Sequence, residues 1–185
     1  MALVGIVYFS GSGTTTVVAK AVQEGVEQAG AQVLMVELQG TDIVEGRWQN
    51  EAVAESLDQC DAIIFGTPTY MGSVSAQLKS FFDAMAPRWY TQVWNGKYTA
   101  AFTASSLASG DKLNALQDIL SFAMQMGMIW VGTGANFQQK LNPGGFYLGA
   151  GVTASTAHEV SAVDADTARY LGRRVTEFLS GSASG

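Results

Sequence analysis

The chain has 185 residues, of which 48% are hydrophobic and only 14% are charged, and its formal net charge is −6. This composition suits one folded domain over 1–185 and excludes an intrinsically disordered chain. The acidic balance argues against nucleic acid as a partner, and one cysteine with one histidine argues against a disulfide scaffold or a metal centre.

The first predicted element is a strand over Leu3–Phe9, a continuous apolar run with β-branched residues that is typical of a strand buried on both faces. The run lacks the basic residues that begin a signal peptide, and no apolar run in the chain reaches the ~18 residues of a membrane helix. We therefore expect a cytoplasmic protein without membrane insertion.

Strand and helix patterns alternate along the rest of the chain. Helices are predicted where apolar residues recur at helical spacing, and strands where short apolar runs end at glycine or polar residues. In chain order the predicted elements are helix 16–29, strand 32–38, short helix 51–57, strand 62–67, helix 74–86, strand 98–104, helix 112–126, strand 128–131 and helix 165–179. The expected irregular segments are a loop over 39–50, an extended loop over 132–162 and a frayed tail over 180–185.

The alternation of strands and helices predicts an α/β fold, a doubly wound five-stranded parallel sheet with helices on both faces. Ligands of such sheets bind at the carboxyl ends of the strands. Three loops that follow predicted strand ends therefore carry the functional expectations.

The first of them, loop 1, spans residues 10–16 and reads Ser-Gly-Ser-Gly-Thr-Thr-Thr. Its hydroxyls, its two glycines and the N–H groups of the helix start are suited to bind a phosphate without a cation. A P-loop would need a Lys before the final Ser or Thr, and a dinucleotide fingerprint would need glycine at Thr16. Glu37 matches a ribose-binding acid, but it stands without that third glycine. The pattern Ser-x-Ser-Gly-x-Thr resembles the phosphate loop of flavodoxins, which hold FMN.

The other two loops follow the third and fourth long strands. Loop 2, residues 66–73, reads Gly-Thr-Pro-Thr-Tyr-Met-Gly-Ser, and its glycines allow the backbone to approach a planar ligand that Tyr70 and Met71 could contact. Loop 3, residues 105–111, reads Ser-Ser-Leu-Ala-Ser-Gly-Asp, and its small residues and backbone amides suit the polar edge of a ring. Each loop alone is ordinary turn chemistry, but three at one sheet edge predict a ligand site.

Motifs spread over nearly the whole chain carry a family resemblance. They are Gly66-Thr67-Pro68-Thr69, Leu78-Lys79-Ser80-Phe81-Phe82-Asp83, Trp89, Gly96-Lys97, Ser105-Ser106, Gly127-Met128, the run Gly144-Gly145-Phe146-Tyr147-Leu148-Gly149-Ala150, and Ala168-Arg169-Tyr170-Leu171-Gly172. The chain resembles the flavodoxin-like NAD(P)H:quinone oxidoreductases of the WrbA type. The resemblance implies noncovalently bound FMN, two-electron reduction of quinones by a nicotinamide, and a tetramer.

The chain departs from the family at two positions. Tyr70 stands where many members have Arg, which removes a cation near the flavin ring. Met126 stands where many members carry a His that lines the substrate pocket, and a methionine cannot donate a proton. FMN binding is therefore better supported by the sequence than quinone reduction.

The residues expected to bind FMN follow the three loops. Those for the phosphate are Ser10, Ser12, Gly13, Thr14 and Thr15; those along the ring are Pro68, Thr69, Tyr70, Met71, Gly72 and Ser73; those at its far side are Ser105, Ser106, Ala108, Ser109 and Gly110. Trp89 and Tyr147 are candidate walls for the nicotinamide or quinone, with core or interface packing as the alternative. No catalytic residue is assigned, because reduced FMN supplies the hydride from its own ring.

Three functions stay open on the sequence. The first is an FMN-dependent NAD(P)H:quinone oxidoreductase. The low share of charged residues predicts an oligomer, and with the tetramer that the resemblance implies we expect a homotetramer or dimer. The second is a flavodoxin-type electron carrier without its own substrate, for which the acidic charge suits docking to basic redox partners. The third is a flavin-free scaffold. His158 is expected on the surface and Cys60 as a buried small side chain.

Overall fold

The computed structural model describes residues 1–135, 137–154 and 159–181, so His158 and the tail over 182–185 lie outside the described residues. Its central sheet has the order β2-β1-β5-β6-β7, with every neighbouring pair parallel. The strands are β1 Leu3–Tyr8, β2 Gln32–Glu37, β5 Ala62–Pro68, β6 Tyr98–Ser105 and β7 Ile129–Trp130. This is the flavodoxin-like doubly wound order, and it confirms the predicted fold class.

A further strand, β8 Ala150–Thr153, corrects the prediction of an extended loop over 132–162. It pairs in parallel with the end of β6, whereas β7 pairs with the beginning of β6, so two strands share the fifth position of the sheet. The glycines that hid this strand allow it to approach β6: a Cβ on Gly149 would lie 2.1 Å from the carbonyl oxygen of Ala101. A short 3₁₀ helix, η2 Phe137–Gln139, also lies in the segment.

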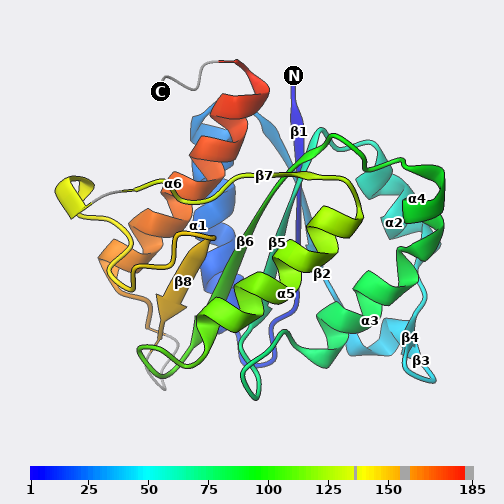
Figure 1. Ribbon diagram of the computed structural model, residues 1–185, viewed down its shortest axis with the longest axis horizontal. Coiled ribbons are helices and arrows are strands. Elements are labelled where there is room, and N and C mark those ends of the chain that lie inside the picture. Colours follow the sequence, from blue (N-terminus) through cyan, green and yellow to red (C-terminus); the bar gives the residue numbers. More distant parts are fainter. Residues whose placement is uncertain (136, 155–158, 182–185) are drawn as a thin grey trace.

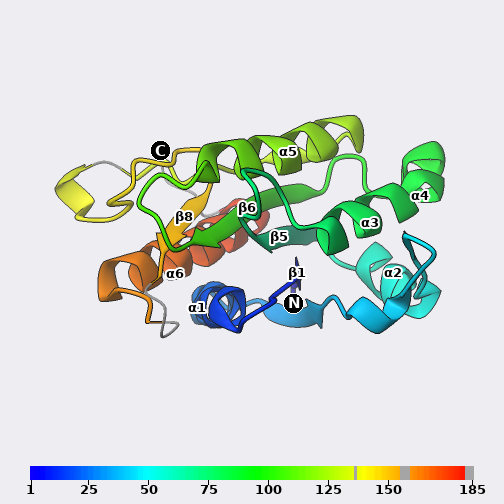
Figure 2. The same ribbon diagram turned by 90° about the horizontal axis from the view of Figure 1, so that it is seen from below.

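Helices cover both faces of the sheet (Figures 1 and 2). One face is covered by α1 Thr14–Gln28 and α6 Ala162–Leu179, and the other by α2 Glu51–Asp58, α3 Ala76–Ala84 and α5 Lys112–Gln125. Two glycines bring α1 and α6 into close contact, because a Cβ on Gly25 would lie 1.9 Å from the carbonyl oxygen of Arg169. A Cβ on Gly172 would likewise meet the carbonyl oxygen of Val22 at 2.2 Å.

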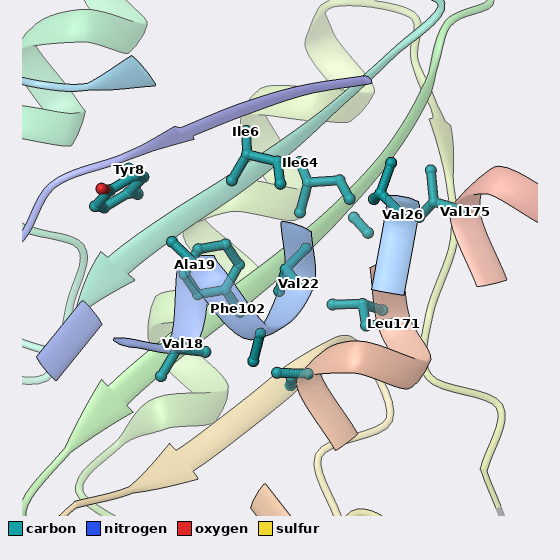
Figure 3. Close-up of a cluster of buried hydrophobic side chains, with 14 of the residues drawn as sticks. Ile6, Tyr8, Val18, Ala19, Val22, Val26, Ile64, Phe102, Leu171 and Val175 are labelled. Atoms are coloured by element: carbon teal, nitrogen blue, oxygen red, sulfur yellow. The ribbon is translucent and has the colours of Figure 1, made fainter. Parts of the chain in front are cut away.

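The core has one apolar cluster on each face of the sheet. Figure 3 shows the cluster under α1 and α6, where strand residues such as Ile6, Ile64 and Phe102 meet Val22 and Leu171. The opposite cluster is rich in aromatic rings and contains the fully buried Trp94, and Cys60 belongs to it as expected. Burial raises the pKa of the Cys60 thiol to about 11, which makes this cysteine unreactive.

The helix predicted over 74–86 is α3, which ends at Ala84, and a short helix that was not predicted, α4 Ala86–Thr91, follows it. The two do not continue as one helix because Pro87 has no N–H to donate. The loop expected over 39–50 contains a 3₁₀ turn, η1 Gly40–Asp42, and a small antiparallel pair, β3 Ile43–Val44 with β4 Arg47–Trp48. Among the described residues, no helix is long and apolar enough to cross a membrane.

Candidate functional site

Loops 1, 2 and 3 meet at the carboxyl edge of the sheet, the lower edge in Figure 1. They enclose a pocket of about 400 Å³, within the usual ~300–1,000 Å³ range of ligand sites. Its lining residues are Ser12, Thr14, Thr15, Pro68, Thr69, Tyr70, Ala104, Ser105, Ser106 and Ala154. All but Ala104 and Ala154 belong to the expected FMN set. Ala104 lies near the end of β6 and Ala154 directly follows β8, and neither small residue carried a motif of its own.

Loop 1 turns into α1 around the hydroxyl of Ser10. The Ser10 hydroxyl oxygen accepts from the backbone N–H groups of Gly13 at 3.1 Å and Thr16 at 3.3 Å, so Ser10 shapes the loop from within. Gly13 is the N-cap residue with φ 96°, a left-handed conformation that favours glycine. The first-turn N–H groups of a helix have no partner within the helix, and together with the helix dipole they suit an anion.

Loop 2 closes over loop 1 through Tyr70. The phenol oxygen of Tyr70 lies where a side chain on Gly11 would stand, since a Cβ there would be 2.2 Å from it. Only glycine at this position allows the two loops to touch without displacing the tyrosine. Tyr70 is 46% exposed and lines the pocket, so its ring forms part of the rim rather than the core.

Glu37, the residue that matched a ribose-binding acid in the sequence, forms hydrogen bonds within the fold. Its carboxylate accepts from the hydroxyl of Tyr8 at 3.1 Å and from the hydroxyl of Thr16 at 3.4 Å. Glu37 does not line the 400 Å³ pocket. It therefore ties the first turn of α1 to the ends of β1 and β2. Burial, with a smaller contribution from the Glu37 charge, raises the pKa of Tyr8 to about 12.

We expect this raised pKa to make stability depend on alkaline pH. Unfolded Tyr8 loses its proton near pH 10 and folded Tyr8 near pH 12, so rising pH favours the unfolded chain across that window. Tyr8→Phe removes the titrating group. The free-energy difference between the wild type and the variant should be constant up to about pH 10 and should then fall by about 1–3 kcal/mol. Urea unfolding at a series of pH values measures it, and parallel curves up to pH 12 would contradict the assignment.

The tip of loop 2 is a tight turn that lies outside the pocket. Tyr70 and Ser73 exchange backbone hydrogen bonds of 3.0 and 3.1 Å, and the two residues between them have positive φ, 47° at Met71 and 80° at Gly72. Met71 is fully exposed. Asn114 of α5 donates to the Gly72 carbonyl at 2.8 Å, and the Ser73 hydroxyl donates to Asp118. Of the expected ring contacts, Met71, Gly72 and Ser73 thus do not line the 400 Å³ pocket.

Loop 3 is held in place by Lys112, a residue for which the sequence predicted no role. Lys112 is completely buried, and its ammonium donates to the carbonyls of Leu107 at 2.6 Å and Ala108 at 2.9 Å and to the Thr153 hydroxyl at 3.1 Å. Burial lowers the pKa of Lys112. A lysine in the first turn of a helix is unfavourable because its charge opposes the helix dipole. This unusual position is the feature of the sequence that could have indicated a special role for Lys112. Ala108, Ser109 and Gly110 stand in loop 3 beyond the pocket lining.

The expected substrate walls do not reach the pocket within one chain. Trp89 lines a separate, larger groove of about 650 Å³ between α3, α4 and α5, and Met126 is buried in the same groove. Tyr147 is 62% exposed and lines neither cavity. The smaller pocket is the candidate cofactor site because it lies at the carboxyl ends of the strands, where doubly wound sheets bind ligands.

The chemistry of the pocket fits FMN. The described residues that line it include no Lys or Arg, so an anion there would be held by hydroxyls and by the amides at the start of α1. Pro68, Tyr70 and Ala104 offer flat or apolar surface for a ring, and Ser105 and Ser106 offer polar groups for its edge. Among the described residues, no group of His, Cys, Asp and Glu is arranged to hold a metal ion.

Comparison with known proteins finds flavodoxins and quinone oxidoreductases that are similar over nearly the whole chain. The profile of the NADPH-dependent FMN reductase family matches residues 4–141. Flavodoxin FldP from Pseudomonas aeruginosa is 35% identical over 94% of each chain, and an NAD(P)H dehydrogenase (quinone) from Rhodopseudomonas palustris is 31% identical over 96% of each. The crystal structure of a flavodoxin, WrbA-like protein from Agrobacterium tumefaciens has a TM-score of 0.77 and 36% identity, and the match covers 99% of this chain and 100% of that one.

Proposed function

Because this chain belongs to the NADPH-dependent FMN reductase family and to its WrbA-type, flavodoxin-like oxidoreductases, we propose that it reduces quinones with NAD(P)H through bound FMN. The observation that carries the proposal is the pocket in which loops 1, 2 and 3 gather hydroxyl, amide and apolar surface at the carboxyl edge of the sheet. In the net reaction NAD(P)H, one proton and a quinone give NAD(P)⁺ and a hydroquinone, and FMN supplies the two-electron chemistry.

The protein's part in this reaction is to bind and orient. Ser12, Thr14 and Thr15 would hold the phosphate against the start of α1. Pro68, Thr69 and Tyr70 would follow one face of the ring, and Ser105 and Ser106 its polar edge. Tyr70 closes the rim against Gly11 and would keep water from that side of the ring. The substrate enters over the face that these side chains leave open.

The test is turnover by the FMN-loaded protein. With benzoquinone present, the protein should consume NADPH or NADH, and the same protein freed of FMN should consume neither. Recovery of activity when FMN is added back shows that the cofactor carries the electrons. A protein that binds FMN and consumes neither nicotinamide contradicts the reductase function.

A flavodoxin-type electron carrier is the second candidate, and two observations favour it. Flavodoxin FldP is 35% identical over nearly the whole chain, and the net charge of −6 suits docking to a basic redox partner. A carrier takes electrons from a reductase protein instead of directly from NAD(P)H. Reduction of the bound FMN only after such a reductase is added would favour the carrier.

We also propose that the chain works in the cytoplasm as a homotetramer or dimer. Only 14% of its residues are charged, and Trp89, Tyr90 and Val93 expose apolar surface in and after α4. Trp89 and Tyr147, which lie outside the pocket of their own chain, are then available to a neighbouring subunit. Light scattering of the FMN-loaded protein measures the assembly.

A further inference from the structure

Lys112 is a fully buried charged residue to which the proposed function assigns no role. A fully buried lysine is rare because its charge loses hydration, and this one lies at the start of α5, directly behind loop 3. Its three hydrogen-bond acceptors are the carbonyls of Leu107 and Ala108 and the hydroxyl of Thr153. Three acceptors match the three protons of an ammonium group, so the contact geometry fits the charged form.

Two of these contacts determine which way the loop 3 amides point. In a trans peptide the N–H is directed opposite to the C=O. The carbonyls of Leu107 and Ala108 point inward at Lys112, so the N–H groups of Ala108 and Ser109, in the same two peptide units, point away from it. Within the described part of the chain, no hydrogen bond uses either N–H. The buried cation polarises both peptide units and strengthens these two donors.

The surroundings of Lys112 leave its charge only partly compensated. The ring of Phe146 lies 5.5 Å from the ammonium, and the carboxylate of Asp164, which is buried at the start of α6, interacts electrostatically with the charge. Thr153 stands at the end of β8, so Lys112 also joins loop 3 to the strand that the sequence did not predict. Loop 3, β8 and the start of α5 are thus held as one unit beside the pocket.

We propose that Lys112 is a positioning residue for the FMN ring, one that fixes loop 3 and holds a positive charge behind its outward amides, and that it thereby raises the midpoint potential of bound FMN. This proposal rests on the proposed FMN function. A positive charge stabilises the more negative redox state of a neighbouring group, which for FMN is the reduced state. Lys112 would then supply a positive charge near the ring, which this chain lacks at position 70 because Tyr70 stands where many family members have Arg.

The test compares three variants by the midpoint potential of bound FMN and by its dissociation constant. Lys112→Met keeps an unbranched side chain that is one atom shorter and removes the charge, so reduced FMN should lose about tenfold more affinity than oxidised FMN. That ratio equals a fall of about 30 mV for a two-electron couple. Asp164→Asn removes the opposing charge, and it should raise the relative affinity for reduced FMN about threefold, or about 15 mV.

Lys97→Met is the matched control. Lys97 also donates to two backbone carbonyls, those of Asp58 and Cys60, but it precedes β6 at the amino edge of the sheet, away from the pocket. This variant should lose stability and keep the wild-type potential. An unchanged potential in Lys112→Met overturns the proposal, as does an equal fall in Lys97→Met. Should Lys112→Met fail to fold, a potential in Asp164→Asn that stays or falls overturns it. A wild type that binds no FMN refutes the function instead.

Discussion

Replacing Thr14 by Asp is expected to lower the affinity for FMN at least 100-fold. Thr14 is the first residue of α1 and lines the pocket, so the new carboxylate would occupy the helix start where the phosphate is expected. Repulsion between the carboxylate and a phosphate about 4 Å away amounts to about 4 kcal/mol at an intermediate dielectric constant. A 100-fold loss corresponds to about 2.7 kcal/mol and lies within that range.

Stability should move in the other direction. A carboxylate at a helix start interacts favourably with the helix dipole by about 0.5 kcal/mol, so Thr14→Asp without FMN should unfold no more easily than the wild type. Quenching of FMN fluorescence measures the affinity, and thermal unfolding measures the stability. A variant that binds FMN within threefold of the wild type would show that the phosphate does not sit at loop 1.

Val17→Asp provides the control for charge alone. Val17 lies on the same helix, is 43% exposed and does not line the pocket, so it adds the same charge outside the site. The affinity for FMN should change less than threefold, because water and salt screen a charge at this exposed position. Equal losses of FMN affinity in both variants would mean that the net charge of the protein decides binding, and not a carboxylate placed at the start of α1.

Replacing Asp58 by Ala is expected to cost about 3–5 kcal/mol of stability, the largest effect outside the pocket. The Asp58 carboxylate accepts from the indole N–H of Trp94 at 2.8 Å and from Arg88 at 3.2 Å. Trp94 is completely buried and Arg88 is 6% exposed. Without the carboxylate the indole N–H is left without an acceptor, and Arg88 keeps only Glu51, whose side chain is largely exposed.

Urea unfolding of the variant measures this cost. Asp83→Ala is the matched control, since it removes one surface ion pair, Lys79–Asp83, whose side chains are 60% and 47% exposed. Exposed pairs of this kind contribute less than about 1 kcal/mol. Asp58→Asn keeps an acceptor for the indole and should fall between the two. Losses of similar size in Asp58→Ala and Asp83→Ala would contradict the structural role given to Asp58.

Local signals were strong enough to predict the architecture and most of the pocket. The three central strands β1, β5 and β6 are runs of mainly apolar residues that are buried almost throughout, and each long helix repeats its apolar residues at helical spacing, so their order along the chain determines a doubly wound sheet. Since parallel strands end at one edge, loops 1, 2 and 3 had to meet there. The division into one domain over 1–185 stays a prediction.

The pattern of residues along the chain did not reveal contacts between segments that lie far apart in the sequence. Strand β8 is four residues long, and it becomes a strand only because β6 offers a free edge that the preceding Gly149 allows it to approach. Trp89 and Tyr147 carried a family motif, but only the packing of α3, α4 and α5 shows that Trp89 faces another groove.

Lys112 illustrates the same division most clearly. The sequence places a lysine at a helix start, whereas the folded chain surrounds it with two loop carbonyls and a threonine 41 residues away. Composition, periodicity and strand-end loops determined the fold class and the place at which the cofactor site is expected, because these depend on nearest neighbours along the chain. The electrostatics of the site were decided by the tertiary structure, because burial and long-range hydrogen bonds determine where a charge is left uncompensated.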